Sequence, residues 1–384
     1  MLPIAQLASL VGVYGVSMLV ASMSAAAAAA VWNAKAAKVA HTTRTHSLGA
    51  LPSWRSMTPV IGVLAVVIGV GLWGARRIAD GELTRTGDPI RVAMIQGNVS
   101  LGERSDPARI PIIFENYLRM TRQAIGQGAE FVIWPESATP FVFENDAASA
   151  SRIRALARET RVPILLGSDQ VTPAAPGAPE RYFNSAFIVR PDGTTGGAYR
   201  KIHLVPFGEY VPAKRIFFFA APLVEAVSDF SAGEEATLLP VGTHRVSTSI
   251  CYEVVYPNLV RQFVAGGSEM LTTITNDAWF GKTSAPYQHF EQAAMRAIEE
   301  GRYLVRAANT GISGVVDPYG RVLRQTPIFQ PAILVQQARF LGGSTVYARY
   351  GDVLAYASAL ATLVLLVFAF ARRLPPSLKL RRTD

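Results

Sequence analysis

The sequence predicts an α/β fold, with one large α/β domain flanked by transmembrane α-helices. Two observations support this prediction. Short apolar, β-rich segments alternate with stretches of helical periodicity over residues 88–349, as they do in layered α/β domains with a largely buried sheet. Outside this region, three uncharged apolar runs are each long enough to be considered as membrane helices.

The composition supports a membrane protein. Of 384 residues, 50% are hydrophobic and 17% are charged, whereas soluble globular chains carry about 25% charged residues. A disordered chain, which needs low hydrophobicity and high charge density, is excluded. The single cysteine cannot form an intramolecular disulfide, so its thiol is either core filling or a reactive group.

Three segments are expected to be transmembrane helices: residues 1–32, 57–75 and 353–371, none of which contains a charged side chain. At 1.5 Å per residue, a helix of 19 residues covers ~28 Å of a hydrocarbon core that is ~30 Å thick. A secretory signal peptide is the alternative for the first segment. Because that segment has no Lys or Arg before a long apolar run, we favour a membrane span.

The net charge of +9 is concentrated beside these spans. Residues 33–56 and residues 372–384 each carry +4, so a nucleic-acid partner is not expected. By the positive-inside rule the first is a cytoplasmic loop and the second a cytoplasmic tail. Residues 88–349 then lie on the opposite, periplasmic side. Arg76 and Arg77 also fall on that outer side, against the rule.

The order of elements within 88–349 follows from apolar periodicity and turn residues. Turns are expected at Pro191–Gly193 and Pro318–Gly320. Helical spacing predicts helices over 109–127, 146–160 and 286–300, and buried β-rich runs predict strands over 91–98, 130–136, 163–168, 184–190, 245–251 and 270–276.

Three reactive side chains follow apolar β-type segments: Glu136, Lys201 and Cys251. Each has an ordinary structural explanation, since Glu136 could begin a helix and Lys201 could be solvated beside Arg200. Cys251 could be a buried core residue, because free cysteine is among the most buried residue types. The combination of the three suggests nucleophilic catalysis instead.

A thiol nucleophile needs a base that takes its proton and a cation that stabilises developing negative charge. With reference pKa values of ~8.5 for Cys and ~4.3 for Glu, proton transfer is uphill by about 5.7 kcal/mol. Burial would raise the pKa of the Glu, and a nearby ammonium would stabilise the thiolate. The set Glu136, Lys201 and Cys251 is therefore chemically coherent if its members are buried together.

The segments around these residues resemble the apolipoprotein N-acyltransferase family of the nitrilase (carbon-nitrogen hydrolase) superfamily. The resemblance rests on WPES (134–137), RKIHLVPFGEYVP (200–212), SICYE (249–253), ITNDAWFG (274–281) and the long segment 288–320. It covers nearly the whole chain. It implies a nitrilase-like α-β-β-α sandwich as the catalytic domain over residues 88–349.

The resemblance also implies residue roles. Glu136 would be the general base, Lys201 the cation that stabilises the oxyanion, and Cys251 the acylated nucleophile. Glu209 would support them, with a turn carboxylate as the alternative. Tyr252 and Glu253 follow the nucleophile as supporting residues, and Asn184, Asn276, Asp277 and Trp279 match pocket positions that purely structural roles would explain equally well. His203 and His289 are expected near the site or at the surface, and we expect no metal and no cofactor.

The activity implied is transfer of an acyl chain from a phospholipid, through a Cys251 thioester, to the α-amine of an S-diacylglyceryl-cysteine at the N-terminus of an apolipoprotein. The enzyme would be a multi-pass protein of the bacterial inner membrane with a periplasmic catalytic domain. One alternative is a membrane-tethered amidase in which water resolves the thioester. Another is a truncated, inactive remnant that binds lipid.

Two departures from the family pattern bear on these expectations. Family members carry further membrane helices upstream, so the chain is expected to lack several of them. Ser105 stands where the family often has Trp in a substrate loop, which leaves open how the acceptor is bound.

The apolar residues 216–219 and 223–224 suggest an arm that touches lipid, with core packing as an equal alternative.

Overall fold

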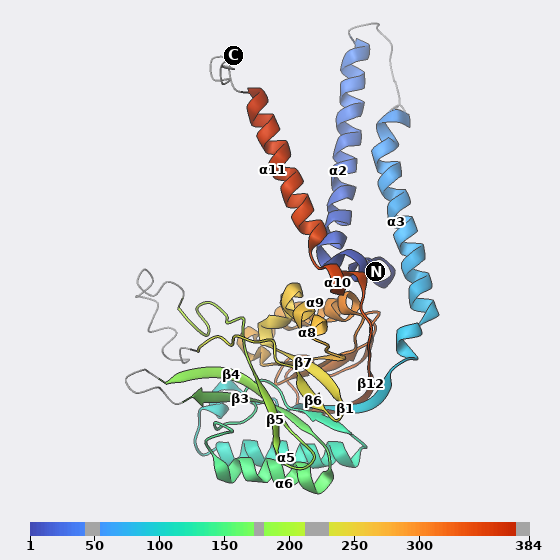
Figure 1. Cartoon of the computed structure of the whole chain (residues 1–384). Coiled ribbons are helices and arrows are strands. Elements are labelled where there is room, and N and C mark those ends of the chain that lie inside the picture. Colours follow the sequence, from blue (N-terminus) through green and yellow to red (C-terminus); the bar gives the residue numbers. More distant parts are fainter. Residues whose placement is uncertain (43–53, 173–179, 212–229, 374–384) are drawn as a thin grey trace, which may run out of the picture.

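The structure is a computed structural model that describes residues 1–42, 54–172, 180–211 and 230–373. The proposed lipid-touching arm at 216–219 and 223–224 lies outside the described residues. Figure 1 shows a layered domain with three long helices, α2, α3 and α11, projecting from one side of it.

One six-stranded sheet has the order β12-β1-β2-β3-β4-β5. Its centre is parallel, because β1 pairs in parallel with β2 and β2 with β3, whereas the remaining pairs are antiparallel. The strands are β1 (Asp88–Gln96), β2 (Phe131–Ile133), β3 (Ile164–Thr172), β4 (Arg181–Val189), β5 (Thr195–Arg200) and β12 (Ala332–Phe340).

The second six-stranded sheet repeats this plan with the order β11-β10-β9-β8-β7-β6. Its central pairs β7-β8 and β8-β9 are parallel, and the outer pairs are antiparallel. The strands are β6 (Leu239–Val241), β7 (His244–Ile250), β8 (Met270–Thr275), β9 (Leu304–Ala308), β10 (Gly314–Val316) and β11 (Val322–Gln325).

The two sheets pack face to face and each is covered by helices on its outer face. Between them lies a core that includes Val92 and Met94 of the first sheet and Val246 and Ile274 of the second. Helices α5 (Ile110–Gly126) and α6 (Ala147–Thr160) cover the first sheet, and α8 (Pro257–Ala265) and α9 (Ala285–Glu300) cover the second. The expected α-β-β-α sandwich is confirmed (Figure 1).

Every expected strand and helix of the domain is present, with ends displaced by a few residues. The expected turns connect β4 to β5 and β10 to β11. The strands without a predicted counterpart include β6, β10 and β11, which have three or four residues each. β11 (VLRQ) has only four residues, all of them exposed, which is too short for an apolar alternation that would reveal a strand.

Within the described part of the chain, three helices are long and apolar enough to cross a membrane, over Ala8–Asn33, Met57–Thr84 and Val353–Arg372. They belong to α2 (Ala8–Thr42), α3 (Trp54–Asp80) and α11 (Val353–Arg373). In Figure 1 the C-terminal end of α2, the N-terminal end of α3 and the C-terminal end of α11 all lie away from the sandwich. The helix ends that adjoin the two basic segments therefore share one side.

The start of the chain is tied to the second sheet's helical layer. Gly12 interrupts α2 with a left-handed φ of 69°, and a Cβ there would lie 2.4 Å from the Tyr347 ring. Because the helix is broken at this point, the amide of Val13 is free to donate to Glu299 Oε1 at 2.7 Å. Gln6 Nε2 donates to the carbonyl of Tyr319 at 2.9 Å.

Candidate active site

Polar residues that follow the parallel strands meet at one edge of the sandwich. Glu136 follows β2, Lys201 follows β5, Cys251 follows β7, Asn276 follows β8 and Asn309 follows β9. Because β5 is antiparallel to β4, which is antiparallel to β3, it ends at the same edge as β2. Carboxyl ends of strands from both sheets thus converge on one site.

The Glu136 carboxylate is buried at the centre of this site. Oε1 accepts a hydrogen bond from Asn184 Nδ2 at 2.7 Å, and Oε2 accepts one from the amide of Asn276 at 2.8 Å. Burial raises the pKa of Glu136, while the nearby ammonium of Lys201 opposes that rise. A carboxylate with a raised pKa is a better base than an exposed one.

Lys201 is the cation of the site, and its side chain is only 1% exposed. Its Nζ lies 2.9 Å from Glu209 Oε1 and 3.7 Å from Glu136 Oε1. Burial alone would lower the pKa of Lys201, but the negative charges of Glu136 and Glu209 raise it overall. The ammonium therefore stays charged, and the alternative of a solvated Arg200-Lys201 pair is wrong.

Glu209 contacts Lys201 and shares a hydrogen-bond donor with Glu136. Its Oε1 also accepts from Asn184 Nδ2 at 3.1 Å, so one amide bridges the two carboxylates. Its Oε2 accepts from the amide of Val205 at 2.8 Å, which fixes the loop that follows Lys201.

Cys251 begins the short 3₁₀ helix η3 (Cys251–Val255) and is 9% exposed. Its φ of 54° places a residue other than glycine in the left-handed region, which is uncommon and is often found at functional sites. Burial raises the pKa of the thiol to about 12; the charge of Glu136 adds to this and Lys201 opposes it. At neutral pH the sulfur is therefore a thiol that needs a base.

Glu253 ties the nucleophile to the segment that carries Lys201. Its Oε2 accepts from the amide of Ile250 at 2.7 Å, and its Oε1 accepts from Tyr199 Oη and from the amide of Ile202, both at 2.7 Å. The carboxylate is fully buried. Glu253 therefore fixes the Cys251 segment and the Lys201 segment relative to one another.

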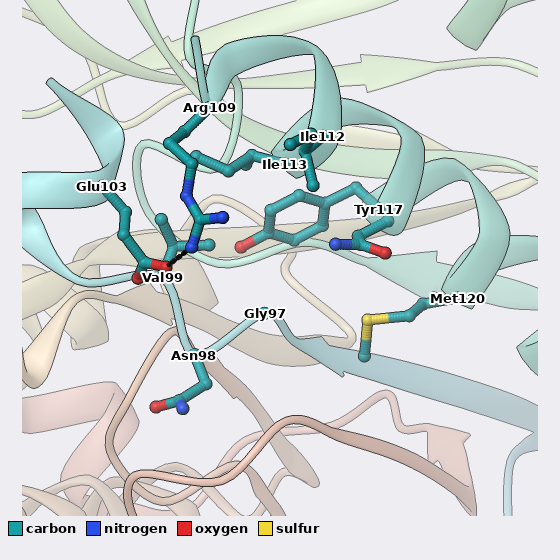
Figure 2. A pocket seen from close by; sticks show the side chains of 10 residues that line it. Gly97, Asn98, Val99, Glu103, Arg109, Ile112, Ile113, Tyr117 and Met120 are labelled. Carbon is teal, nitrogen blue, oxygen red and sulfur yellow. Dashed lines mark hydrogen bonds and ion pairs between the residues drawn. The ribbon is translucent and has the colours of Figure 1, made fainter. Parts of the chain in front are cut away.

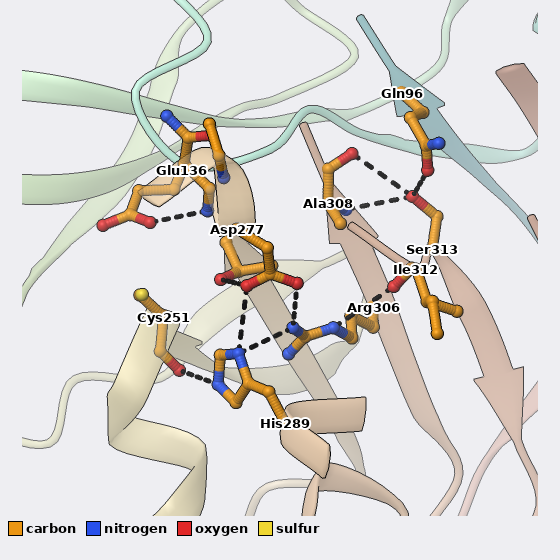
Figure 3. A network of polar contacts seen from close by, with 12 residues as sticks. Gln96, Glu136, Cys251, Asp277, His289, Arg306, Ala308, Ile312 and Ser313 are labelled. Atoms are coloured by element: carbon orange, nitrogen blue, oxygen red, sulfur yellow. Dashed lines mark hydrogen bonds and ion pairs between the residues drawn. The ribbon is translucent and has the colours of Figure 1, made fainter. Parts of the chain in front are cut away.

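A buried polar network lies behind Cys251 (Figure 3). His289 Nε2 lies 3.1 Å from the carbonyl oxygen of Cys251, and His289 Nδ1 lies 2.9 Å from Arg306 Nη2 and 3.0 Å from Asp277 Oδ1. Since a carbonyl only accepts, Nε2 carries a proton. Burial and the charge of Arg306 lower the pKa of His289, so the neutral ring uses Nδ1 as an acceptor from Arg306.

Arg306 and Asp277 complete this network as a buried ion pair of 2.9 Å. Burial opposes ionisation of Asp277, but the charge of Arg306 outweighs it, and the pKa of Asp277 is held at about 2. Asp277 was expected as a pocket residue, and it lies here on the side of Cys251 that faces His289 (Figure 3).

Asn276 is linked to Asn309, which sequence analysis missed. Asn309 Nδ2 donates to Asn276 Oδ1 at 3.0 Å and to the carbonyl of Val99 at 2.6 Å, and its Oδ1 accepts from the amide of Val99 at 2.9 Å. Asn309 follows an apolar strand, as Glu136 and Cys251 do, so the same signal would have found it. Arg306, inside β9, carried no such signal.

The loop held by Asn309 also borders a cavity of about 210 Å³ (Figure 2). Val99, Ile112, Tyr117 and Met120 give it an apolar lining, and Arg109 forms an ion pair of 2.5 Å with Glu103 at its edge.

The remaining candidates lie at the periphery. Tyr252 is partly exposed, and Trp279, a candidate pocket residue, is 60% exposed. His203 is exposed and its ring packs on Tyr256, and Ser105 ends the short helix α4 (Leu101–Arg104). Among the residues that the structure describes, no group of three or more acidic, His or Cys side chains is arranged to hold a metal.

This arrangement can perform nucleophilic acyl transfer. A protonated thiol, a carboxylate made more basic by burial and a permanent cation lie together in a buried site. The first amides of η3 have no partner within that helix and are available to an oxyanion beside Cys251.

The sequence profile described as carbon-nitrogen hydrolase matches residues 91–367. Solved structures of an amidase from Nesterenkonia sp. share the fold: one superposes with a TM-score of 0.52 at 22% identity, covering 71% of this chain and 98% of the amidase. Another superposes with a TM-score of 0.51 at 23% identity, covering 71% and 97%.

Curated relatives are similar over a longer part of the chain. An apolipoprotein N-acyltransferase of Geobacter metallireducens is 38% identical over 375 residues, which are 97% of this chain and 68% of that protein. An apolipoprotein N-acyltransferase of Bradyrhizobium diazoefficiens is 33% identical over 388 residues, which cover 97% of this chain and 68% of that protein. One of Pseudomonas aeruginosa is 35% identical over 296 residues, or 75% of this chain and 56% of that protein.

Proposed function

The chain belongs to the apolipoprotein N-acyltransferase family of carbon-nitrogen hydrolases, and from this premise we propose that it transfers an acyl chain from a phospholipid to the N-terminus of a diacylglyceryl apolipoprotein. The observation that carries the proposal is the buried set of Glu136, Lys201 and Cys251 in a domain joined to three apolar helices. A donor that resides in a bilayer requires an enzyme held at its surface.

In the first step, Cys251 Sγ attacks the ester carbonyl carbon of the phospholipid while Glu136 takes the thiol proton. Lys201 and the amide of Tyr252 stabilise the oxyanion of the tetrahedral intermediate. The carbon-oxygen ester bond then breaks, and Glu136 returns the proton to the leaving oxygen. The products are a Cys251 thioester and a lysophospholipid.

In the second step, the free α-amine of the acceptor's diacylglyceryl-cysteine attacks the thioester carbonyl. Glu136 takes a proton from the amine, and the carbon-sulfur bond breaks. The same proton then passes to the departing sulfur, which restores the thiol. The acceptor leaves as an amide, so the reaction is ping-pong, with Glu136 acting alternately as base and acid.

The charge distribution supports an orientation with the sandwich outside the cytoplasm. The helix ends next to the basic segments 33–56 and 372–384 lie away from the sandwich, and basic segments remain in the cytoplasm. We therefore place the protein in the bacterial inner membrane as a multi-pass protein, with its catalytic domain in the periplasm beside the outer leaflet.

The test is incubation of the purified chain with phospholipid vesicles and a synthetic diacylglyceryl-cysteine peptide. The proposal predicts a peptide heavier by one acyl chain, and no product with Cys251→Ala. Release of free fatty acid without peptide acylation would support the amidase alternative. Absence of both products from a folded protein would support the inactive remnant.

A further inference from the structure

A second cleft, of about 480 Å³, lies where the outer end of α3 meets the sandwich. Its walls are formed by Trp73 and Arg76 of α3, by the 3₁₀ helix η1 (Glu82–Thr84) and by the loop of residues 342–345. Arg302 lies at its base.

This cleft is separate from the catalytic site. Arg302 precedes β9, and Ser268, whose carbonyl accepts from Arg302 Nε at 3.0 Å, precedes β8. Asn276 and Asn309, by contrast, follow these two parallel strands. The cleft and the catalytic groups therefore lie at opposite edges of the second sheet, roughly 20 Å apart at about 3.3 Å per strand residue.

The loop of residues 342–345 lines this cleft. Arg302 donates to the carbonyls of Gly342 and Gly343, at 3.2 Å and 2.7 Å. Because the C=O and N–H of a trans peptide point in opposite directions, the amides of Gly343 and Ser344 point away from Arg302. Gly343 has a left-handed φ of 78°, as in the backbone concavities that bind anions.

These amides lack acceptors within the described part of the chain. No backbone or side-chain oxygen there accepts from the N–H of Gly342, Gly343 or Ser344. All three residues are exposed, so a ligand from solution or from a membrane can reach their amides.

The α3 side of the cleft adds positive charge at a defined depth. The uncharged run 57–75 covers about 28 Å, so Arg76 directly follows the hydrocarbon core, at the level of lipid phosphates. Its side chain is 85% exposed, and its ion pair with Asp80 is long, at 3.9 Å. Trp73 lies one turn earlier, as interfacial tryptophans do.

We propose that this cleft binds the phosphodiester head group of an anionic phospholipid of the outer leaflet, between Arg76 and the amides of loop 342–345. Asp80 and Glu82 also line the cleft, but Arg76, Arg77 and Arg302 outnumber them. The bound lipid would neutralise the arginines that stand on the outer side against the positive-inside rule. The inference rests on the membrane placement proposed above and not on acyl transfer.

The test is native mass spectrometry of the full chain in detergent, with Cys251→Ala as the parent so that no acyl adduct can form. Phosphatidylglycerol, diacylglycerol and inorganic phosphate are the three probes. Arg76→Gln is compared with Arg158→Gln, which removes the same charge from α6 on the layer far from the spans. The donor site is the same in all variants, so lipid bound there contributes equally to each of them. Differences in lipid retention among the variants are therefore due to the cleft.

We expect Arg76→Gln to weaken phosphatidylglycerol retention about tenfold, since charge-assisted hydrogen bonds to phosphate are strong, and Arg158→Gln to match the parent. Equal retention by the parent and Arg76→Gln would overturn the proposal. So would equal retention of diacylglycerol, which would indicate apolar contact alone. Binding of inorganic phosphate as tight as that of phosphatidylglycerol would assign the cleft to a free anion instead of a lipid. Because Cys251 is absent, each outcome is independent of whether the enzyme transfers acyl chains.

Discussion

The ammonium of Lys201 lies closer to Glu209, at 2.9 Å, than to the carboxylate of Glu136, the proposed base, at 3.7 Å. This unequal sharing matters because a direct ion pair with Lys201 would lower the proton affinity of Glu136. Burial raises the pKa of Glu136, and the negative charge of Glu209 adds to that rise. Glu209 therefore maintains the proton affinity of Glu136, the proposed base, and holds the ammonium of Lys201 in place.

Replacing Glu209 should slow acylation without weakening lipid binding. In Glu209→Gln the ammonium loses its nearest anion and pairs with Glu136, which lowers the pKa of the base. We expect the rate of Cys251 acylation to fall about 10- to 100-fold, in the range typical of general-base effects, with little change in KM for phospholipid. Glu159→Gln, an exposed carboxylate on α6, is the charge-matched control. A rate equal to that of the control would contradict this role.

Removal of the base should change thiol ionisation and acylation in opposite directions. The charge of Glu136 contributes to the raised pKa of Cys251, so Glu136→Gln should lower that pKa and speed alkylation by iodoacetamide at pH 9–10. Acylation by phospholipid should nevertheless be lost, because no group accepts the thiol proton. Both effects are measured by the rates of alkylation and of acylation as a function of pH, for wild type and for Glu136→Gln. Slower alkylation in the variant would show that Glu136 does not act on the thiol.

Loss of the cation should destabilise the fold in a pH-dependent way. In Lys201→Met the carboxylates of Glu136 and Glu209 remain buried and unpaired, at a cost of about 3–5 kcal/mol near pH 8. The pKa of Glu136, which burial already raises, would rise further without the ammonium that opposes the rise, and it would lie above the unfolded value of ~4.3. A carboxyl whose pKa is raised by folding contributes stability that is fully present below the unfolded pKa. That contribution is lost as the pH rises through the folded pKa.

The difference in melting temperature between wild type and Lys201→Met should therefore be largest near pH 8 and should narrow as the pH approaches 5. Thermal unfolding followed by circular dichroism in detergent measures it at both pH values. A pH-independent difference would indicate lost packing and not unpaired charge.

Local periodicity in the sequence predicted α/β layers, whereas the sandwich followed from the family resemblance. Glu136, Lys201 and Cys251 were selected because each follows a β-type segment, and in the structure they lie after β2, β5 and β7 at one edge of the sandwich. Their catalytic roles stay predictions. Asp277 and Glu253, by contrast, were named from the family pattern alone. The contact of Asp277 with His289 and the hydrogen bond that Glu253 accepts from Tyr199 depend on packing between elements far apart in the chain.

His289 shows why the rest of the site could not be predicted. A histidine in an amphipathic helix gives the same local signal whether it faces solvent or the core. Its contact with the carbonyl of Cys251 depends on how α9 packs against η3. The break in α2 at Gly12 is hidden for a similar reason, because its cause is the Tyr347 ring, which is more than 300 residues away.

His289 should act by positioning the nucleophile. His289→Phe keeps the ring volume but loses the donor to the carbonyl of Cys251, so the left-handed conformation at Cys251 loses a support. We expect acylation to slow about tenfold or more with an unchanged KM, because one buried hydrogen bond to the nucleophile's own backbone is lost. His289→Gln, which retains a donor, should recover most of the rate. Equal rates for the two variants, with both folded, would limit His289 to a packing role.

The central claim is that Cys251 carries the acyl group, and intact mass spectrometry tests it most directly. After incubation with phospholipid and no acceptor, the wild-type chain should gain the mass of one acyl chain, and neutral hydroxylamine should remove it as expected for a thioester. Cys251→Ala should gain no mass. A folded wild-type chain that gains no acyl mass, or an adduct that persists in Cys251→Ala, would contradict the mechanism.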